Sequence, residues 1–263
     1  MIKALSIILT TAILAVAQNS PAAKSSRDGY LTPTTTPNVI LVVPPPPQTG
    51  DARFNADMAI FRQTRSLEGT PRWTLAQSDD NVSMAGLLKA FSCSLGITLD
   101  SQNAAKTYAL LVRANADSSR ASGILKALYA HKRPYQVENA NICLSAQGKT
   151  ALERSPDYPS GHATGGWETG LILAELAPQK ATEILSRARA FGQSRVVCGV
   201  HNLSAVEAGW LTATAVFAAQ NSAQEFRADL DAARNELSSL LKNAPPEPQG
   251  CPLEHDTLSK NPY

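Results

Sequence analysis

The segment Tyr158-Pro159-Ser160-Gly161-His162 combines turn-forming residues with a histidine at the start of an expected helix. Pro159 and Gly161 favour a tight turn. The first turn of a helix has N–H groups without intrahelical partners and carries the positive end of the helix dipole. Such a helix start favours a bound phosphate or similar oxyanion, beside which a histidine could hold and deliver a proton. On its own, the segment fits this anion site and a solvated glycine-containing loop equally well.

Two cations precede this segment, in the stretch from Lys126 to Pro134. Lys126 and Arg133 are seven residues apart, which is close to two helical turns, so the spacing predicts that both project from one face of a helix. The alternative is an ordinary solvated surface. His131 and Lys132 fall on other faces, and we interpret them as peripheral.

A second histidine follows a third cation in the stretch Ser194-Arg195-Val196-Val197-Cys198-Gly199-Val200-His201. The apolar residues between Arg195 and His201 indicate a buried segment, and a buried arginine and histidine need partners. A bound anion would supply them, and so would a structural salt bridge.

Helices are expected to position these residues. Beyond residue 51 the sequence is rich in alanine, with apolar residues three and four apart and with Gly, Pro, Ser and Asp between the segments. This pattern predicts successive helices and no convincing strand. The expected helices span approximately residues 51–66, 79–95, 101–115, 117–132, 162–176, 180–197, 204–219 and 222–242. We therefore predict an all-α fold, with a single compact multi-helix domain over residues 51–243.

The two ends of the chain differ from this domain. Residues 1–17 carry one charge, Lys3, before an apolar run that ends in Ala-Val-Ala, the pattern of a cleaved signal peptide; an uncleaved anchor is the alternative. Residues 18–50 are rich in Pro, Thr and Ser and predict an extended arm, in which 39–43 forms at most a short apolar piece packed on the domain. Residues 244–263 are rich in proline and predict a loose tail.

Composition limits the class of protein. With 43% hydrophobic and 17% charged residues, the composition of this chain of 263 residues predicts a globular protein. Its formal net charge of +2 does not suggest nucleic-acid binding. We expect a periplasmic or secreted protein with no membrane association after signal cleavage. Four cysteines in an exported chain favour disulfides. Three pairings exist, of which we expect Cys93–Cys143 with Cys198–Cys251; free thiols are the alternative. No spacing suits a zinc site.

The order Lys-x6-Arg-Pro, Pro-Ser-Gly-His and Ser-Arg-x5-His resembles the signature of the type 2 phosphatidic acid phosphatase and vanadium haloperoxidase superfamily. Within it, an exported chain with these motifs looks like a bacterial class A non-specific acid phosphatase. The resemblance extends from about Asp51 to Gln220 and leaves out the arm and the tail. It implies an all-helical fold and hydrolysis of phosphomonoesters through a phosphohistidine intermediate, with no metal and no cofactor.

The resemblance also implies roles for individual residues. His201 would be the nucleophile that attacks phosphorus, and His162 would protonate the leaving alkoxide and then activate water. The phosphate oxygens would be held by Lys126, Arg133, Ser160, Gly161 and Arg195.

One departure from the family pattern concerns the nucleophile. The pattern ends in His-x3-Asp, and that aspartate orients the nucleophilic imidazole; this chain has Ala205 there, whose side chain cannot accept a hydrogen bond. Glu207 is the nearest carboxylate in sequence and a candidate for that role. Alternatively, Ser204 and Glu207 form a capping box for the next helix, and a backbone carbonyl or a side chain from elsewhere orients His201.

We therefore predict an exported acid phosphatase that acts on small-molecule phosphomonoesters. The departure at Ala205 leaves a periplasmic phosphate-binding protein with weakened catalysis as one alternative. A cradle for phosphate also suits vanadate as a phosphate mimic, so a vanadate-dependent haloperoxidase is another. The motifs are expected to contact only the phosphoryl group of a substrate, so they do not predict which phosphoester is preferred. Alanine-rich helices could serve a homo-oligomer as easily as a core.

Overall fold

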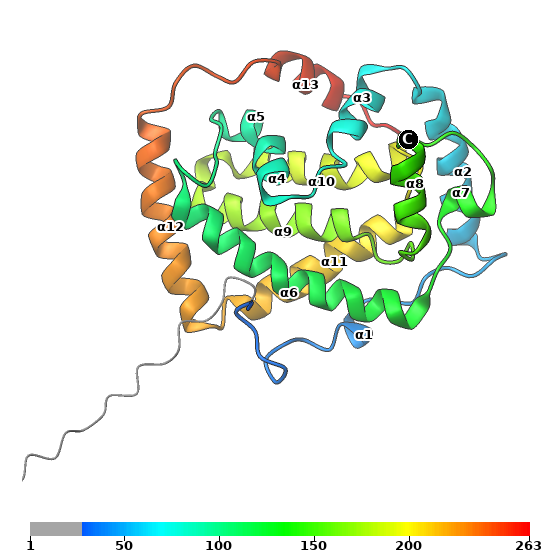
Figure 1. Cartoon of the computed structure of the whole chain (residues 1–263), viewed down its shortest axis with the longest axis horizontal. Coiled ribbons are helices and arrows are strands. Elements are labelled where there is room, and N and C mark those ends of the chain that lie inside the picture. The colour runs from blue at the N-terminus through cyan, green and yellow to red at the C-terminus, as the bar shows by residue number, and fades with distance from the viewer. Residues whose placement is uncertain (1–27) are drawn as a thin grey trace, which may run out of the picture.

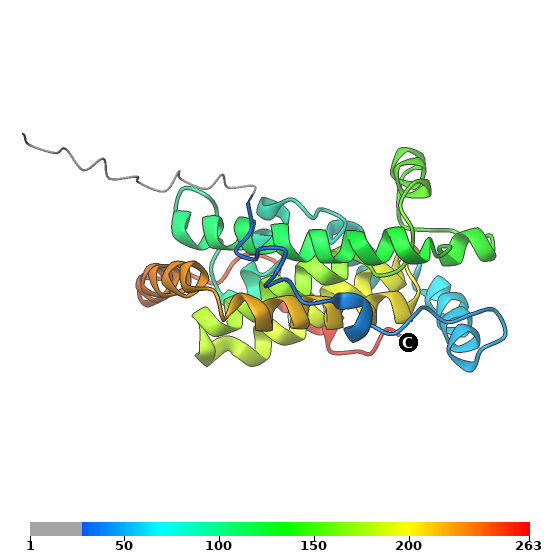
Figure 2. The same cartoon turned by 90° about the horizontal axis from the view of Figure 1, so that it is seen from below.

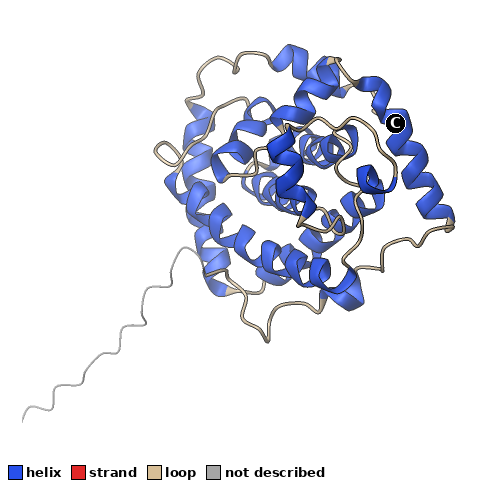
Figure 3. Ribbon diagram, turned by 45° about the vertical axis from the view of Figure 1, so that its right-hand side comes forward, coloured by secondary structure: helices blue, strands red, loops and turns tan. Residues whose placement is uncertain are grey.

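The structure is a computed structural model that describes residues 28–263; the expected signal peptide and the first residues of the arm lie outside this range. Every regular element of the described range is a helix (Figure 3), which confirms the predicted all-α fold. The larger helices are α2 (Ala52–Thr64), α3 (Pro71–Ser78), α4 (Met84–Ala90), α6 (Ala105–Tyr129), α8 (Ala146–Glu153), α9 (Gly161–Leu176), α10 (Ala181–Val197), α11 (Leu203–Gln220), α12 (Gln224–Lys242) and α13 (Cys251–Leu258).

Three consecutive helices, α9, α10 and α11, lie at the centre of the molecule (Figure 1). A short 3₁₀ turn, η2 (Pro178–Lys180), joins α9 to α10, and residues 198–202 join α10 to α11. Because short connections make neighbouring helices antiparallel, the start of α9, the end of α10 and the start of α11 meet at one end of this layer. Two of the sequence motifs lie there.

Glycines allow α9 to pack closely against its neighbours. A Cβ atom on Gly166 would lie 2.4 Å from the Phe191 ring, and one on Gly170 would lie 2.4 Å from a methyl group of α10. In the same way, Gly209 of α11 approaches the carbonyl oxygen of Ser160, which a Cβ would meet at 2.7 Å. Since a side chain does not fit at these positions, the spacing of the three helices depends on direct contact with the main chain.

The long helix α6 crosses the central layer and packs against α9, α11 and α12 (Figure 1). The sequence predicts a break near residue 116, but the helix is continuous. Next to the expected break, the buried carboxylate of Asp117 accepts hydrogen bonds from other segments, including the N–H of Tyr30 at 2.8 Å and Nε2 of Gln220 at 3.1 Å. Through these bonds Asp117 fastens the arm to α6.

The helix α12 covers one end of the core with an amphipathic face. Phe226, Leu230, Ala233 and Leu237 recur at helical spacing and are all buried, as the sequence indicates. Burial of an apolar side chain of the larger type contributes roughly 1.5–3 kcal/mol. This face therefore holds α12 against α6 and α9.

The apolar piece of the arm packs on the domain as expected, whereas the tail is more ordered than expected. Residues 39–42 form the short helix α1 (Val39–Val42), which packs on α11 and α6. The tail contains α13 rather than a loose segment. Its first residue is tied to the short helix α5 (Ser92–Leu95) by the disulfide Cys93–Cys251.

The second disulfide joins Cys143 to Cys198, so the expected pairing of consecutive cysteines is wrong. Cys198 directly follows α10, and the Cys143 N–H also donates to the Cys198 carbonyl at 3.0 Å. Cys93, near the other end of α10, is out of reach of this position. The Cys143–Cys198 bridge fastens the loop before α8 beside the turn that carries His201.

Two short stretches outside the expected helices are also helical. Thr70 accepts a hydrogen bond from the N–H of Trp73 and begins α3, and Ser145 accepts one from Gly148 and begins α8. The capping side chains satisfy donors that would otherwise lack a partner. In Figure 2, α8 stands away from the helical layers, next to the end of α6. None of the described helices is long and apolar enough to cross a membrane.

Candidate active site

The start of α9 forms one wall of the site. Ser160 is its N-cap: the hydroxyl accepts from the N–H of Ala163 at 3.3 Å, and its own N–H donates to the carbonyl of Ala205 at 2.8 Å. The N–H groups of Gly161 and His162 follow in the first turn, where a helix offers no acceptor. An anion placed there would meet these donors and the positive end of the helix dipole. The peptide bond before Pro159 is cis.

His201 lies in the turn between α10 and α11 and is 3% exposed. Its Nδ1 is 2.8 Å from Oδ1 of Asp157, and its Nε2 is 3.0 Å from Nη1 of Arg133. A carboxylate accepts and a guanidinium donates. These partners therefore assign the proton to Nδ1 and leave Nε2 unprotonated, with its lone pair accepting from Arg133. An unprotonated Nε2 is the state that a nucleophilic imidazole requires.

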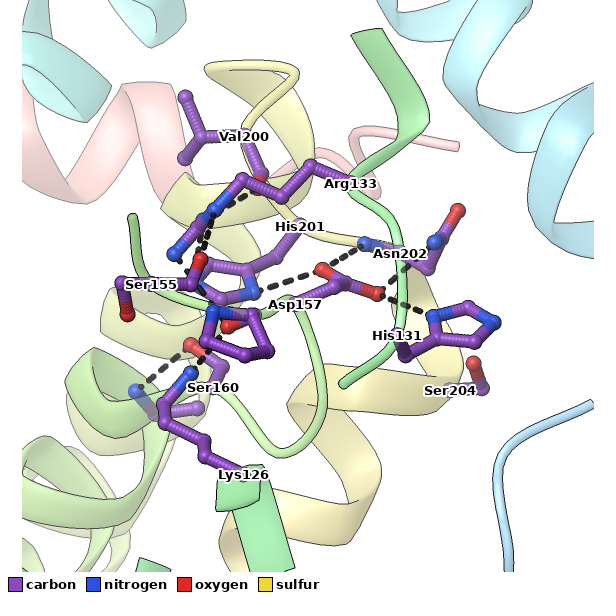
Figure 4. A network of polar contacts seen from close by, with 12 residues as sticks. Lys126, His131, Arg133, Ser155, Asp157, Ser160, Val200, His201, Asn202 and Ser204 are labelled. Carbon is purple, nitrogen blue, oxygen red and sulfur yellow. Dashed lines mark hydrogen bonds and ion pairs between the residues drawn. The ribbon is translucent and has the colours of Figure 1, made fainter. Parts of the chain in front are cut away.

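Asp157 is the centre of the buried polar network in Figure 4. Besides His201, its carboxylate accepts from Nδ2 of Asn202 at 2.8 Å, from the Asn202 N–H at 3.3 Å and from Nδ1 of His131 at 3.2 Å. Burial alone would raise the pKa of this carboxyl, but the bonds from His131 and His201 outweigh it and hold the pKa below its usual range. Asp157 therefore stays ionised in acid solution.

Asp157 is the carboxylate that contacts His201, which in the family pattern is expected to be oriented by an aspartate at the position of Ala205. Glu207 is half-exposed on α11 and pairs with Nη2 of Arg53 at 3.4 Å, so it is not the carboxylate that contacts His201. The carboxylate that does comes from another element, 44 residues earlier in the chain. The alternative that a side chain from elsewhere in the chain orients His201 is therefore confirmed, although the sequence did not identify that side chain as Asp157. The available signal was an acidic residue directly before the Tyr-Pro-Ser-Gly-His motif.

The capping-box alternative is also wrong. The N-cap of α11 is Asn202, and Ser204 already lies inside the helix. The N–H and hydroxyl of Ser204 donate to the carboxylate of Asp57 on α2, at 2.9 and 2.5 Å. This contact fixes the start of α11 to α2, next to the nucleophile.

Arg133 and Lys126 reach the site by different routes. The helix α6 ends at Tyr129, Ala130 is in the left-handed region at φ 45°, and Arg133 is the extended residue before α7 (Pro134–Val137). The expected shared helical face is therefore wrong, because the residue before a proline avoids the helical region. The buried guanidinium of Arg133 is held by carbonyl oxygens of Ser155 and Val200, at 2.8 and 2.7 Å.

Lys126, in the last turn of α6, points toward the same loop. Its Nζ donates to the carbonyl oxygen of Pro156, and Nη2 of Arg133 lies 3.5 Å from that oxygen. Burial lowers the pKa of Lys126 to about 8, with a further contribution from the charge of Arg133. The amine therefore remains a cation at neutral and acid pH. A small cavity of about 190 Å³ opens between Lys126 and Gly161.

Arg195 and His162 form the other side of the site. Arg195 is fully buried at the end of α10, and its Nη1 contacts Oδ1 of Asp80 at 3.1 Å and the carbonyl oxygen of Asp79 at 3.2 Å. Its Nε and Nη2 have no partner among the described residues. Buried donors of this kind need an acceptor, and a phosphate oxygen would supply one.

Asp79 anchors this side from behind. Its carboxylate accepts from Arg187 at 2.5 and 3.2 Å and from the hydroxyl of Ser194 at 2.6 Å. Arg72 of α3 donates to the same hydroxyl at 2.9 Å. The serine of the Ser-Arg motif thus has a structural role, because it joins α3 and α10 while Arg195 faces the site.

Burial and neighbouring arginines favour the neutral form of both histidines. For His201, burial and then Arg133 lower the pKa well below its usual value, against the effect of Asp157. For His162, burial and then Arg195 lower the pKa, and its contacts with Asp80 oppose them. The site therefore combines one neutral, oriented imidazole with a second that can accept a proton in acid solution.

Each residue implied as a phosphate ligand lies at this end of α9, α10 and α11. The arrangement offers three cations, two unpaired donors of Arg195 and the first-turn N–H groups of α9 to one anion, with the His201 imidazole beside them. A site with these features can bind a phosphoryl group and transfer it to nitrogen. Among the described residues, no group of His, Cys, Asp and Glu is arranged to hold a metal ion.

Comparison with known proteins shows the family to which the chain belongs. Residues 106–227 match the family model of the PAP2 superfamily. The chain is 36% identical over 209 residues to an acid phosphatase of Zymomonas mobilis, with 79% of each chain covered. It is 32% identical to a non-specific acid phosphatase of Providencia stuartii, over 74% of this chain and 79% of that one. It is 30% identical to a non-specific acid phosphatase of Salmonella typhimurium, over 73% and 77%.

Proposed function

Because this chain belongs to the acid phosphatases of the PAP2 superfamily, we propose that it hydrolyses phosphomonoesters in two steps through a phosphohistidine on His201. The observation that carries this proposal is the setting of His201. Its Nδ1 is held by Asp157 at 2.8 Å, while its Nε2 faces the cationic side of the site beside Arg133 at 3.0 Å.

In the first step, Nε2 of His201 attacks phosphorus and the bond from phosphorus to the leaving oxygen breaks. His162 gives its proton to that oxygen, so the product leaves as an alcohol. Lys126, Arg133 and Arg195 stabilise the charge on the phosphoryl oxygens. Asp157 stabilises the positive charge that His201 acquires, and is proposed to do the work of the aspartate that other family members carry at the position of Ala205.

In the second step, water attacks the phosphohistidine. His162, now neutral, takes a proton from the water, the P–N bond breaks and inorganic phosphate leaves. His201 returns to its neutral state, with Nδ1 still bonded to Asp157. In this proposal the protein cations supply all the charge stabilisation, and hydrolysis needs no metal or other cofactor.

The proposed pH optimum is acidic. His162 must begin protonated, and its pKa lies below the usual histidine value, so the acid form is lost and activity falls as the pH rises toward neutrality. His201 must begin neutral, and its pKa is lowered further, so its protonation reduces activity only at still lower pH. The active range lies between these two ionisations.

The alternative of a binding protein without turnover depended on Ala205. Since the described structure has a buried carboxylate on Nδ1 of His201, the reason for that alternative is weakened. Vanadate is retained as a phosphate mimic that would bind to the same cations. We further propose that the protein acts in the periplasm or as a secreted protein, which its two disulfides and its bacterial relatives support.

The proposal is tested by comparing the wild type with His201→Ala on p-nitrophenyl phosphate between pH 4 and pH 8. We expect an optimum below pH 7 in the wild type, and a loss of at least about 1,000-fold in kcat for the variant. Acid-quench trapping should detect a phosphoenzyme in the wild type only. Glu207→Gln is the matched control and should retain activity. Turnover by His201→Ala at the wild-type rate would contradict the proposal.

A further inference from the structure

Asp80 is a charged residue of the site that the mechanism above does not use. It lies in the loop between α3 and α4 and directly follows Asp79, whose bonds to Arg187 and Ser194 fix the start of this loop. Its side chain is 39% exposed, so it stands where the site meets solvent. A carboxylate beside a phosphate site repels the substrate, and its presence there calls for a physical reason.

The contacts of Asp80 converge on the proposed general acid. The main-chain carbonyl oxygen of Asp80 is 3.0 Å from Nε2 of His162, and its Oδ1 is 3.4 Å from the same nitrogen. Two acceptors on Nε2 require a proton there. The proton that His162 can transfer is therefore the one on Nδ1, which bonds to no other side chain or carbonyl within the described part of the chain.

Charges around His162 favour and oppose its protonation. On the α10 side lies Arg195, which disfavours the imidazolium, as does burial. On the α3–α4 side, the carboxylate of Asp79 is neutralised by Arg187. The Asp80 carboxylate is shared between Arg195 and His162. Of the two carboxylates, that of Asp80 is therefore the one placed to favour the imidazolium of His162. The hydrogen bond from His162 in turn lowers the pKa of Asp80.

We propose that Asp80 is a positioning residue for the general acid: its carboxylate and main-chain carbonyl hold Nε2–H of His162, and its negative charge sustains the imidazolium whose Nδ1 proton passes to the leaving oxygen. This inference rests on the proposed function, because it assigns a partner to the residue that protonates the leaving group.

The role predicts a dependence on the leaving group. An alkoxide is a poor leaving group and needs the proton, whereas p-nitrophenolate delocalises its own charge and needs it less. Removing the charge of Asp80 should therefore harm alkyl phosphates more than p-nitrophenyl phosphate. Neutralising a charge that merely screens Arg195 would instead change phosphate binding, and would affect both substrates alike.

The experiment compares the wild type, Asp80→Asn and Asp80→Glu on glycerol 2-phosphate and p-nitrophenyl phosphate across pH. For Asp80→Asn we expect a loss in kcat of about 10- to 50-fold on the alkyl ester and of about threefold on the aryl ester. The alkaline limb of the kcat/KM profile should move to lower pH by about one unit. Asp80→Glu should recover part of the alkyl-ester activity. Asn is isosteric with Asp, and circular dichroism checks that each variant folds.

Equal losses on the two esters, with an unchanged alkaline limb, would overturn the inference. So would a lower inhibition constant for inorganic phosphate as the sole effect, because Asp80 would then act only through Arg195. A wild type that turns over neither ester and forms no phosphoenzyme would contradict the proposed function itself. The wild type is therefore assayed for turnover and for the phosphoenzyme before any Asp80 variant is made.

Discussion

Each of the two proposed catalytic histidines, His201 and His162, is paired with a carboxylate, and these two carboxylates differ in burial and in number of partners. Asp157 is fully buried and accepts hydrogen bonds from His201, His131 and Asn202. Asp80 is partly exposed, and its carboxylate divides its contacts between His162 and Arg195. Both carboxylates have a pKa below the usual range, and in both cases hydrogen bonds from histidine contribute to this.

The difference corresponds to the two proton requirements of the proposed reaction. The nucleophile needs a fixed ring with a constant proton on Nδ1, and a buried carboxylate with several donors is rigid and always ionised. The general acid must lose and regain a proton in each cycle, and a carboxylate near solvent can support this without holding the proton itself. The environment of each carboxylate therefore matches the role of its histidine.

The largest effect is expected from Asp157→Asn. An amide at this position can direct its NH₂ group toward His201 and favour the wrong tautomer, so the lone pair would be lost from Nε2. We expect a loss of about 1,000-fold or more in kcat on alkyl and aryl esters alike, by analogy with other oriented histidines. Steady-state kinetics on both esters measures it.

Glu207→Gln is the control for this comparison, since it removes a carboxylate from the nucleophile's own helix without touching His201. Its activity should stay within about twofold of wild type, because an exposed ion pair contributes little. A loss from Glu207→Gln comparable to that from Asp157→Asn would contradict the assignment of Asp157.

A second effect, smaller than the first, is expected from moving the carboxylate. In the Asp157→Ala background, Ala205→Asp would place an acid four residues after His201, where the family pattern has it. We expect this double variant to exceed Asp157→Ala by about 10- to 100-fold in kcat, short of full activity because the bonds of His131 and Asn202 are lost. The rates of the two variants on p-nitrophenyl phosphate give this ratio.

Ala205→Asp alone is the informative companion of that double variant. It would add a second carboxylate beside Asp157, and two close anions disfavour each other's ionisation. Lower activity than wild type is expected. If the double variant gains nothing over Asp157→Ala, the two positions are not interchangeable.

The smallest effects concern stability. At pH 6, Asp157→Asn should lower the free energy of unfolding by about 2–3 kcal/mol, because buried hydrogen bonds to a charged acceptor are lost, whereas Asp80→Asn should cost under about 1 kcal/mol. The folded-state pKa of Asp157 is lowered, so its contribution is present above the unfolded value of about 3.9 and is lost as the pH falls through the folded pKa.

Urea unfolding at pH 6 and at pH 3 measures this contrast. The gap between wild type and Asp157→Asn should narrow at the lower pH. If Asp157→Asn and Asp80→Asn lowered the free energy of unfolding equally at pH 6, the distinction between the buried and the partly exposed pair would be contradicted.

The sequence was sufficient for the helical class, for most of the long helices and for the residues of the three motifs. These features depend on local patterns: apolar residues at helical spacing, and Pro and Gly at helix starts. It was not sufficient for α6, because the expected helices 101–115 and 117–132 are one continuous helix. Within this helix, the carboxylate of Asp117 is bonded to Tyr30 of the arm and to Gln220, contacts that local patterns do not predict.

The carboxylate partners could not be identified from sequence for a related reason. Asp157 and Asp80 come from loops far from their histidines along the chain, and only the packing of α9, α10 and α11 brings them together. His131 was interpreted as peripheral on the assumption of a helix that in fact ends at Tyr129. The disulfide pairing likewise follows from which segments lie beside each end of α10.

The glycine contacts of α9 have a consequence for altering this protein. Gly166 and Gly170 place the main chain of α9 directly against α10. The distance between the first turn of α9 and the last turn of α10 is therefore set by this contact, and not by the size of side chains on α9. Substitutions elsewhere in the core should therefore leave the proposed phosphate site at this end of the helices intact. A library that aims at new leaving groups should keep both glycines, and it should also keep Asp79 and Asp80 in the loop after α3.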